Sequence, residues 1–124
     1  MSAGTFHFIA EQGVTFNPIL TYRDATGALV DLTGVSARMQ VRESYEATTV
    51  VLDLTTENGG ITLGGALGTI ALSICAEDMS AVPVNSGPGT PPAAFYVYDL
   101  ELVAGAVTQR LLQGKFTVTR EVTR

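Results

Sequence analysis

The side chains best suited to acid–base chemistry in this sequence are two carboxylates, Asp99 and Glu101, in the stretch YVYDLELV. Residues two apart on a strand share one face and lie about 7 Å apart. Carboxylates at such a separation can hydrolyse glycosidic bonds or bind a metal ion. Here, however, alternation places both acids on the face opposite the apolar residues, and no aromatic platform accompanies them. The pair therefore predicts the solvated outer face of a sheet.

One histidine and one cysteine are the other candidates for chemistry. His7 lies in TFHFIA without the orienting acid and the nucleophile motif that a catalytic histidine needs. We expect it to point outward from a terminal strand, opposite Phe6 and Phe8. Cys75 can form no intrachain disulfide and lacks zinc-finger spacing, so we expect a small, partly buried residue at a strand end. The sequence predicts no enzyme, no catalytic residue, no metal site and no cofactor.

The elements that position these side chains are predicted to be strands, because apolar and polar residues alternate with a period of two. Four stretches show this alternation: VSARMQVR, TIALSIC, YVYDLELV and KFTVTREV. The pattern fits antiparallel sheets with one face on a core and the other in water. The residues expected to face the core are Val35, Ala37, Met39, Val41, Ile70, Leu72, Ile74, Tyr96, Tyr98, Leu100, Leu102, Phe116, Val118 and Val122.

Turn residues separate these strands at short intervals, which is typical of a β-sandwich or barrel. RDATGALVDLTG is expected to turn at Asp24 and Gly27. VAGAV is expected to close the last hairpin, between YDLEL and QRLLQGKFTV. Pro18 predicts an edge strand or a bulge, because proline has no N–H to donate. Residues 76–82 are expected to form one helical turn at most. The loop 83–92 is either a slack connection or a flexible arm that reaches a neighbour.

Composition places the chain among folded proteins of one domain, expected to span residues 1–124. Charged residues make up only 15%, so much of the surface either contacts other subunits or is a threonine-rich face in water. The net charge of -5 disfavours nucleic-acid binding, although Arg23, Arg38 and Arg42 are candidates for a local basic cluster. Neither a signal peptide nor a membrane span is recognised. We therefore expect synthesis in a host cytoplasm and no membrane contact.

Three stretches together resemble a known family. They are FHFIAEQGVTFNPILTYRDATGALVDLTGVSARMQVRE, GGALGTIALSICAEDM and FYVYDLELVAGAVTQRLLQGKFTVTREVT. In this order they are similar to small virion proteins of tailed bacteriophages and to the N-terminal immunoglobulin-like module of upper baseplate proteins. In those proteins the module attaches receptor-binding parts to the tail and continues into a long helical or fibrous region. The present sequence contains no such region, so the resemblance implies a stand-alone adaptor or decorating subunit.

The sequence and the resemblance predict an all-β, antiparallel immunoglobulin-like β-sandwich that acts as a structural subunit of a virion. The expected partners are other virion proteins and copies of the chain in a symmetric homo-oligomer. Contacts are expected through the edges near Pro18 or the N-terminal strand, and through the loop 83–92. A tail, baseplate or fibre-attachment adaptor is the leading expectation, and a capsid decoration protein is the alternative. A carbohydrate-binding module would need an aromatic platform, which Tyr96 and Tyr98 do not provide if they face the core.

Overall fold

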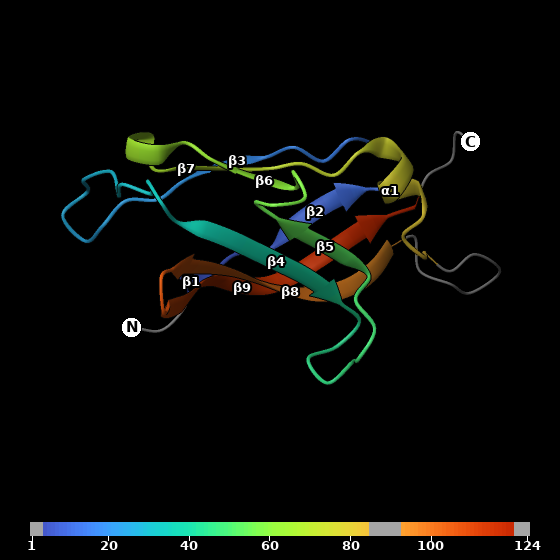
Figure 1. The fold of residues 1–124 in the computed structure, drawn as a ribbon. Coiled ribbons are helices and arrows are strands. Elements are labelled where there is room, and N and C mark those ends of the chain that lie inside the picture. The colour runs from blue at the N-terminus through green and yellow to red at the C-terminus, as the bar shows by residue number, and fades with distance from the viewer. Residues whose placement is uncertain (1–3, 85–92, 121–124) are drawn as a thin grey trace.

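The computed structural model describes residues 4–84 and 93–120 and has two packed layers of strands (Figure 1). Within these residues, no helix has the length and apolar character that crossing a membrane requires. The elements in chain order are β1 (Gly4–Thr5), β2 (Phe8–Glu11), β3 (Ile19–Thr21), β4 (Ser36–Arg42), β5 (Leu52–Thr55), β6 (Ile61–Leu63), the 3-10 turn η1 (Gly65–Leu67), β7 (Thr69–Leu72), α1 (Ala76–Ser80), β8 (Ala93–Ala104) and β9 (Val107–Thr119).

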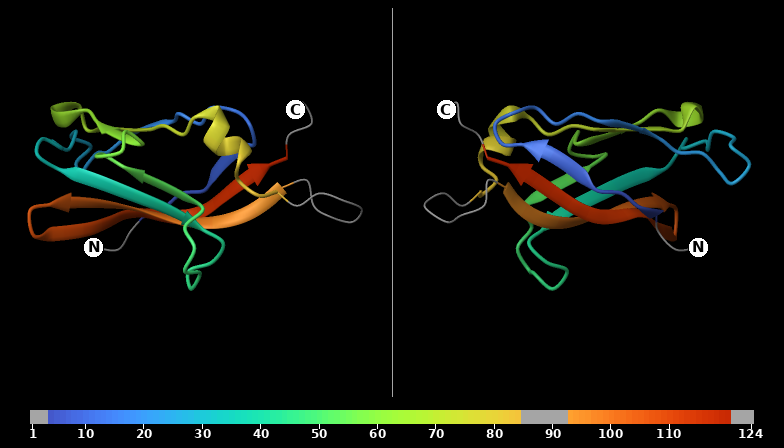
Figure 2. Two further views of the ribbon diagram at one scale, coloured as in Figure 1. Left: turned by 45° about the vertical axis from the view of Figure 1, so that its right-hand side comes forward. Right: turned by 180° about the vertical axis from the view of Figure 1, so that it is seen from behind.

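The larger sheet has the order β1-β9-β8-β4-β5, with β2 also paired to β9, and the smaller sheet has the order β3-β7-β6. Strands β1 and β2 run parallel to β9, as Figure 2 shows from behind, and every other pair of the described strands is antiparallel. This strand order corresponds to strands B, E and D facing strands C, F and G of an immunoglobulin domain. The fold is an all-β, immunoglobulin-like β-sandwich, as expected, although the parallel N-terminal strands were not.

The core lies between the two sheets and consists of their inward-facing side chains. Leu100 and Phe116 are fully buried in it. Every residue expected in the core is buried, apart from Val35, which is partly buried, and Val122, which lies outside the described residues. The chain lacks the paired cysteines and the tryptophan that mark antibody domains. Apolar packing between the sheets therefore holds this sandwich together without a disulfide.

The last hairpin contains a β-bulge that the alternating pattern did not predict. Leu100 pairs with Leu112 and Glu101 pairs with Arg110, so Leu111 is the extra residue on β9. Both leucines of β9 pack partly against the core. A bulge of this kind re-aims the side chains on one side of it. Here it returns Arg110 to the outer face of the sheet, next to Glu101.

The long connection between β3 and β4 is built on two similar turns. The Oδ1 atom of Asp24 accepts a hydrogen bond from Thr26 N at 2.9 Å, and that of Asp31 accepts one from Thr33 N at 2.9 Å. The threonine hydroxyls also donate to these carboxylates and hold the pKa of both carboxyls below its usual range. A glycine with a positive φ follows each threonine. The turn expected at this point in the chain is confirmed.

Two further expectations concern Pro18 and the helix. Pro18 directly precedes β3, which lies at the edge of the smaller sheet and pairs only with β7 among the described strands. The predicted edge is therefore confirmed. The helix α1 has five residues, slightly more than the single turn expected. Most of the loop 83–92 lies outside the described residues.

Candidate functional site

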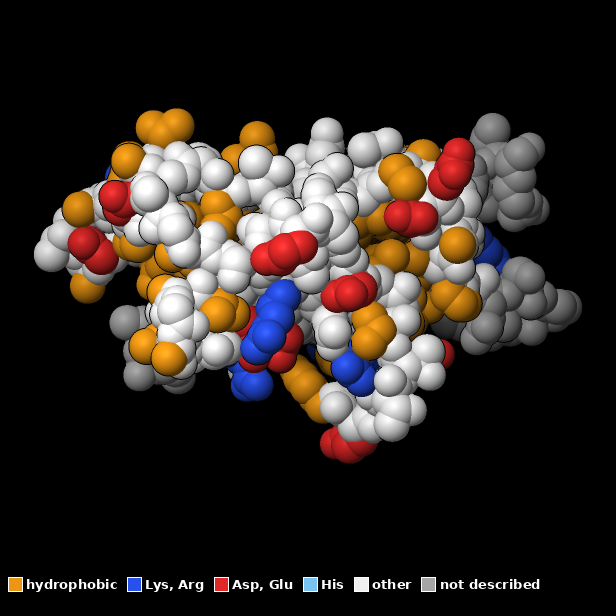
Figure 3. Space-filling model, in the orientation of Figure 1, with side chains coloured by type: hydrophobic (Ala, Val, Ile, Leu, Met, Phe, Trp, Pro, Cys, Tyr) orange, Lys and Arg blue, Asp and Glu red, His pale blue; other side chains and the backbone are white. Residues whose placement is uncertain are grey.

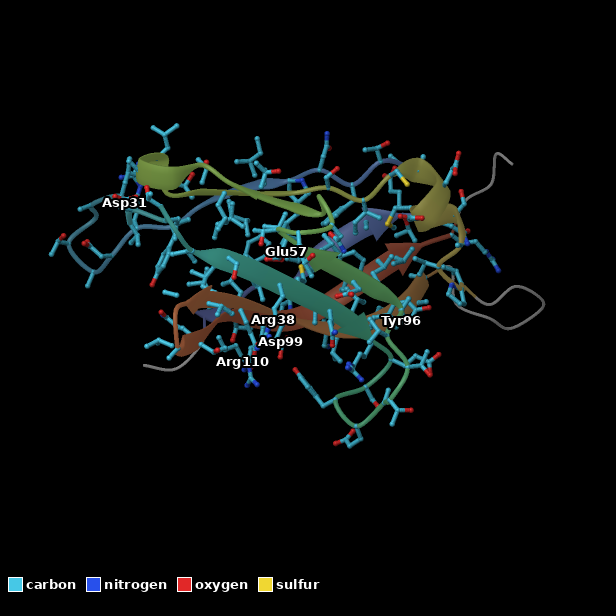
Figure 4. The ribbon with its side chains drawn as sticks, in the orientation of Figure 1. Asp31, Arg38, Glu57, Tyr96, Asp99 and Arg110 are labelled. Carbon is cyan, nitrogen blue, oxygen red and sulfur yellow. The ribbon has the colours of Figure 1, made fainter. Side chains whose placement is uncertain are left out.

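Each member of the carboxylate pair binds an arginine on the outer face of the larger sheet. Glu101 Oε1 lies 2.8 Å from Arg38 Nε on β4, and Asp99 Oδ2 lies 3.4 Å from Arg110 Nε on β9. Figure 4 labels three of these four side chains on this face. Exposed ion pairs of this kind contribute at most about 1 kcal/mol to stability. The two acids are therefore part of a charged outer face, as the alternation predicted.

The electrostatics of this face are balanced. Burial raises the pKa of the Asp99 carboxyl and Glu101 raises it further, while Arg110, Arg42 and Arg38 oppose the rise. Figure 3 shows acidic and basic side chains together in this region, without a broad basic patch. The three arginines considered as candidates for a basic cluster come together only in part. Arg38 and Arg42 both act on Asp99, whereas Arg23 donates to a carbonyl of its own turn.

His7 and Cys75 take no part in a common site. His7 is exposed as expected, and its Nδ1 atom accepts a hydrogen bond from Lys115 N at 3.0 Å. Cys75 is exposed, which corrects the expectation of partial burial. Ile74 takes the inward position beside it, so Cys75 points outward where α1 begins. Within residues 4–84 and 93–120, no group of three or more His, Cys, Asp and Glu side chains could bind a metal ion.

The N-terminal segment forms the edge of both sheets, which we call the N-terminal edge (residues 4–21). β2 lies beside β9 in the larger sheet, and β3 lies beside β7 in the smaller one. Between them the chain crosses from one sheet to the other (Figure 2). Backbone hydrogen bonds from Gln12 N to Thr119 O and from Phe16 N to Ile74 O, both 2.9 Å long, fix the crossing.

Phe8 anchors this edge in the core. Its ring lies 5.0 Å from that of Tyr98 and 5.6 Å from that of Phe16, measured between centroids. The Tyr98 hydroxyl donates to Phe6 O at 2.7 Å. At this point the edge runs so close to β9 that a Cβ atom at Gly114 would lie 2.2 Å from Phe6 O. Only glycine fits there, and the chain leaves strand geometry between β1 and β2.

The outward side of the N-terminal edge is apolar. Four of its large hydrophobic side chains are exposed: Phe6 at 47%, Ile9 at 72%, Val14 at 48% and Ile19 at 68%. Phe6 was expected to face the same side as the buried Phe8, but the interruption between β1 and β2 leaves it half-exposed. Phe95, 65% exposed, extends this surface, because both Ile9 and Phe95 pair with the same residue of β9. Ile9 is exposed on the outer face of the larger sheet and Ile19 on the outer face of the smaller sheet, so these side chains flank the edge on both sides. Exposed apolar side chains gathered along one edge are typical of interaction sites.

Three depressions lie elsewhere on the surface. One of about 240 Å³ is lined by Tyr45 together with Gln40, Arg42 and Asp99. Tyr45 is 66% exposed and was not considered in the sequence analysis, although it lies in a polar stretch after an alternating strand. Two larger depressions border α1: one of about 460 Å³ lies beside β5, and one of about 500 Å³ lies beside the loop between β4 and β5. Their linings include acidic side chains, Asp78 in both, but neither a histidine nor a lysine or arginine.

No protein-family model matches this sequence, and no curated protein matches it. Among solved structures, the chain is similar to the NK cell receptor Nkp44, a triggering partner in natural cytotoxicity, at 12% identity and a TM-score of 0.40; the match covers 98% of this chain and 100% of that one. A structure of VGSC beta subunits, studied for multimeric cell-adhesive interactions, matches at 13% identity and a TM-score of 0.36, covering 98% and 96%. Likenesses this distant carry no functional argument, and the strand order is what defines the chain as an immunoglobulin-like sandwich.

Proposed function

We propose that this chain is a non-enzymatic structural subunit of a tailed-phage virion, an adaptor in the tail, baseplate or fibre-attachment region. Its resemblance to small virion proteins motivates the setting. The observation that carries the contact role is the N-terminal edge, where edge strands of both sheets lie beside exposed apolar side chains. Such an edge buries apolar area and adds backbone hydrogen bonds when a neighbour pairs with it.

The mechanism is static. Glu11 is the sole charged side chain in residues 4–22, so little charge has to be desolvated when this surface is covered. Natural edges exposed to water usually carry lysine or other charges that prevent pairing. A stable contact buries about 1,000 Å² or more in total, so it would have to include the edge, the neighbouring Phe95 and a matching surface on a second subunit. Copies of the chain in a symmetric ring, or another virion protein, supply that surface.

A double substitution tests this proposal, Ile9→Lys with Ile19→Lys, because it adds two charges to the surface and leaves the core unchanged. The matched control is Leu67→Lys with Val107→Lys, which changes two aliphatic residues of similar exposure, 64% and 66%, outside the N-terminal edge. We expect the edge variant alone to lose self-association in light scattering and incorporation into particles, with both variants melting like the wild type. Equal assembly of the two variants would contradict the proposal.

The location within the particle separates the adaptor from a capsid decoration protein. Antibodies against the chain, viewed by electron microscopy on purified particles, are expected to label the tail. Labelling over the head would favour the decoration protein and would retain the same contact surface. A chain that is absent from particles altogether would refute both.

A carbohydrate-binding module is a second candidate because of Tyr45. Its exposed ring lies beside Gln40, Arg42 and Asp99 in the depression of about 240 Å³, and this is the aromatic and polar combination that binds sugars. Tyr96 and Tyr98, in contrast, are buried and cannot contribute a platform. Specific binding to a glycan array that Tyr45→Ala abolishes would favour this function, and absence of binding would exclude it.

A further inference from the structure

The side chain of Asn58 caps the free edge of β5. Within the described residues, β5 pairs with β4 alone, so its opposite edge faces away from the sheet. Asn58 Oδ1 accepts hydrogen bonds from Thr55 N at 2.9 Å and from Gly60 N at 2.8 Å. Asn58 Nδ2 donates to Asp53 O at 3.0 Å. The amide therefore satisfies backbone groups with which an added strand would pair.

The two atoms of this amide cannot exchange places. Two N–H donors face Oδ1 and one carbonyl oxygen faces Nδ2, so a flipped amide would set donor against donor and acceptor against acceptor. The amide nitrogen is consequently essential, because a carboxylate has no hydrogen to donate to Asp53 O.

We propose that Asn58 is a site of spontaneous modification, at which loss of the amide nitrogen releases the β5 edge. The backbone nitrogen of Gly59 attacks Cγ of Asn58 and gives up its proton. A new C–N bond forms, the Cγ–Nδ2 bond breaks, and the nitrogen leaves as ammonia. Water then opens the five-membered imide at either carbonyl, which gives aspartate or isoaspartate. The reaction needs no oxidant or reductant, and water is its one co-reactant.

The surroundings of Asn58 favour this reaction over that of Asn17. Asn58 is exposed in a turn. Gly59 has no side chain to shield its nitrogen, and apart from its two neighbours in the chain no residue lies within 4 Å of the place where a Cβ would be. Asn17 is also exposed but precedes Pro18, whose ring nitrogen has no proton to lose and cannot attack in this way. Asn17 is therefore an internal control.

In the folded chain, the reaction at Asn58 also changes the hydrogen bonds at the free edge of β5. Formation of the imide removes Nδ2, so the hydrogen bond to Asp53 O is necessarily lost. In the aspartate product an acceptor oxygen faces that carbonyl, and a further negative charge joins a segment that already carries the exposed acids Asp53 and Glu57. The isoaspartate product lengthens the backbone by one carbon within the turn. The folded chain should therefore react more slowly than the unfolded chain, and the reacted chain should have an open edge.

Peptide mapping by mass spectrometry of the full chain, incubated at mildly alkaline pH with and without urea, tests the site. We expect Asn58 to convert at least about tenfold faster than Asn17 in both states, since proline cannot supply the nucleophile. Conversion should be several-fold slower in the folded chain. No conversion in the folded chain, equal rates for the two asparagines, or equal rates with and without urea would each overturn the proposal.

The variant Asn58→Asp, which supplies one product directly, tests the consequence. We expect its Tm to fall by about 3 °C or more, and the Gly60 amide hydrogen to exchange faster than in the wild type. The control Asn17→Asp adds the same charge at an exposed asparagine, and its Tm should stay within about 1 °C of the wild type. Equal Tm values for the two variants would overturn the role of the amide at the β5 edge.

Discussion

Gly114→Ala is the substitution that should separate the N-terminal edge from the sandwich. The added Cβ would lie 2.2 Å from Phe6 O, 2.9 Å from Phe6 C and 3.0 Å from His7 Nδ1. Relief of the first contact requires the backbone to move by at least about 1 Å. That movement also breaks the hydrogen bond from the Tyr98 hydroxyl to Phe6 O.

The expected loss combines two contributions. Overpacking of a tight contact costs about 1–3 kcal/mol, and the lost hydrogen bond costs about 1 kcal/mol more. The free energy of unfolding should fall by about 2–4 kcal/mol and the Tm by about 10 °C. Urea unfolding measures the first quantity and calorimetry the second. Hydrogen exchange should show faster exchange at Phe6 N and Lys115 N, whose acceptors are Gln113 O and His7 Nδ1.

Gly4→Ala is the matched control on the same edge. Its Cβ would meet Leu112 Cδ2 at 3.3 Å, and this methyl group ends a flexible side chain that can move aside. We expect this variant to lose no more than about 0.5 kcal/mol. If Gly114→Ala unfolds like Gly4→Ala and the Phe6 amide stays protected, then the close approach does not hold the edge in place.

Three further predictions concern the core, the charged face and the isolated side chains. Leu100→Asp and Phe116→Asp should abolish soluble expression, because both side chains are fully buried and an unpaired charge there costs several kcal/mol. Normal yield and a normal Tm would mean that these side chains face the solvent rather than the core. The pKa of the Asp99 carboxyl is raised above 3.8 in the folded chain, so the folded chain loses stability relative to the unfolded chain as the pH rises and this carboxyl ionises. The free energy of unfolding of Asp99→Asn, measured in urea, should therefore increase relative to that of the wild type between about pH 3 and pH 7. A decrease relative to the wild type would contradict this prediction. His7→Ala and Cys75→Ser should leave particle assembly intact, and a strict requirement for either in a complementation assay would indicate a site there.

Side-chain alternation was sufficient to predict the buried face in the four stretches that show it. The pattern around Met39 and Leu100 placed both residues correctly, because in a two-layer sandwich the inward direction depends on local strand geometry alone. Alternation was not sufficient for the bulge at Leu111. Two leucines in succession interrupt the pattern in RLLQG, and this interruption is the signal that the sequence offers.

Which strands pair with each other was harder to predict than which face of a strand is buried. The parallel pairing of Phe8 with Phe116 joins residues from opposite ends of the described chain, and nothing in either stretch specifies direction. The exposed edge near Pro18 was predicted, because a missing N–H is a local property. The exposed apolar side chains along it, such as Ile9, were not predicted. Their exposure follows from the position of the strand in the finished sheet, which short-range patterns do not encode.

The pairing of the N-terminal edge with β9 also determines when that edge can form. The hydrogen bond between Lys115 N and His7 Nδ1 joins positions 108 residues apart, and contacts of such wide separation fold slowly. During translation β1 and β2 have no β9 on which to dock until almost all of the described chain has been made. For that interval Phe8, like Ile9 beside it, is exposed to water and to other nascent chains. A newly made N-terminal strand that docks on the β9 of a neighbouring copy would exchange strands between subunits, so the same surface gives the chain a route both to assembly and to misassembly.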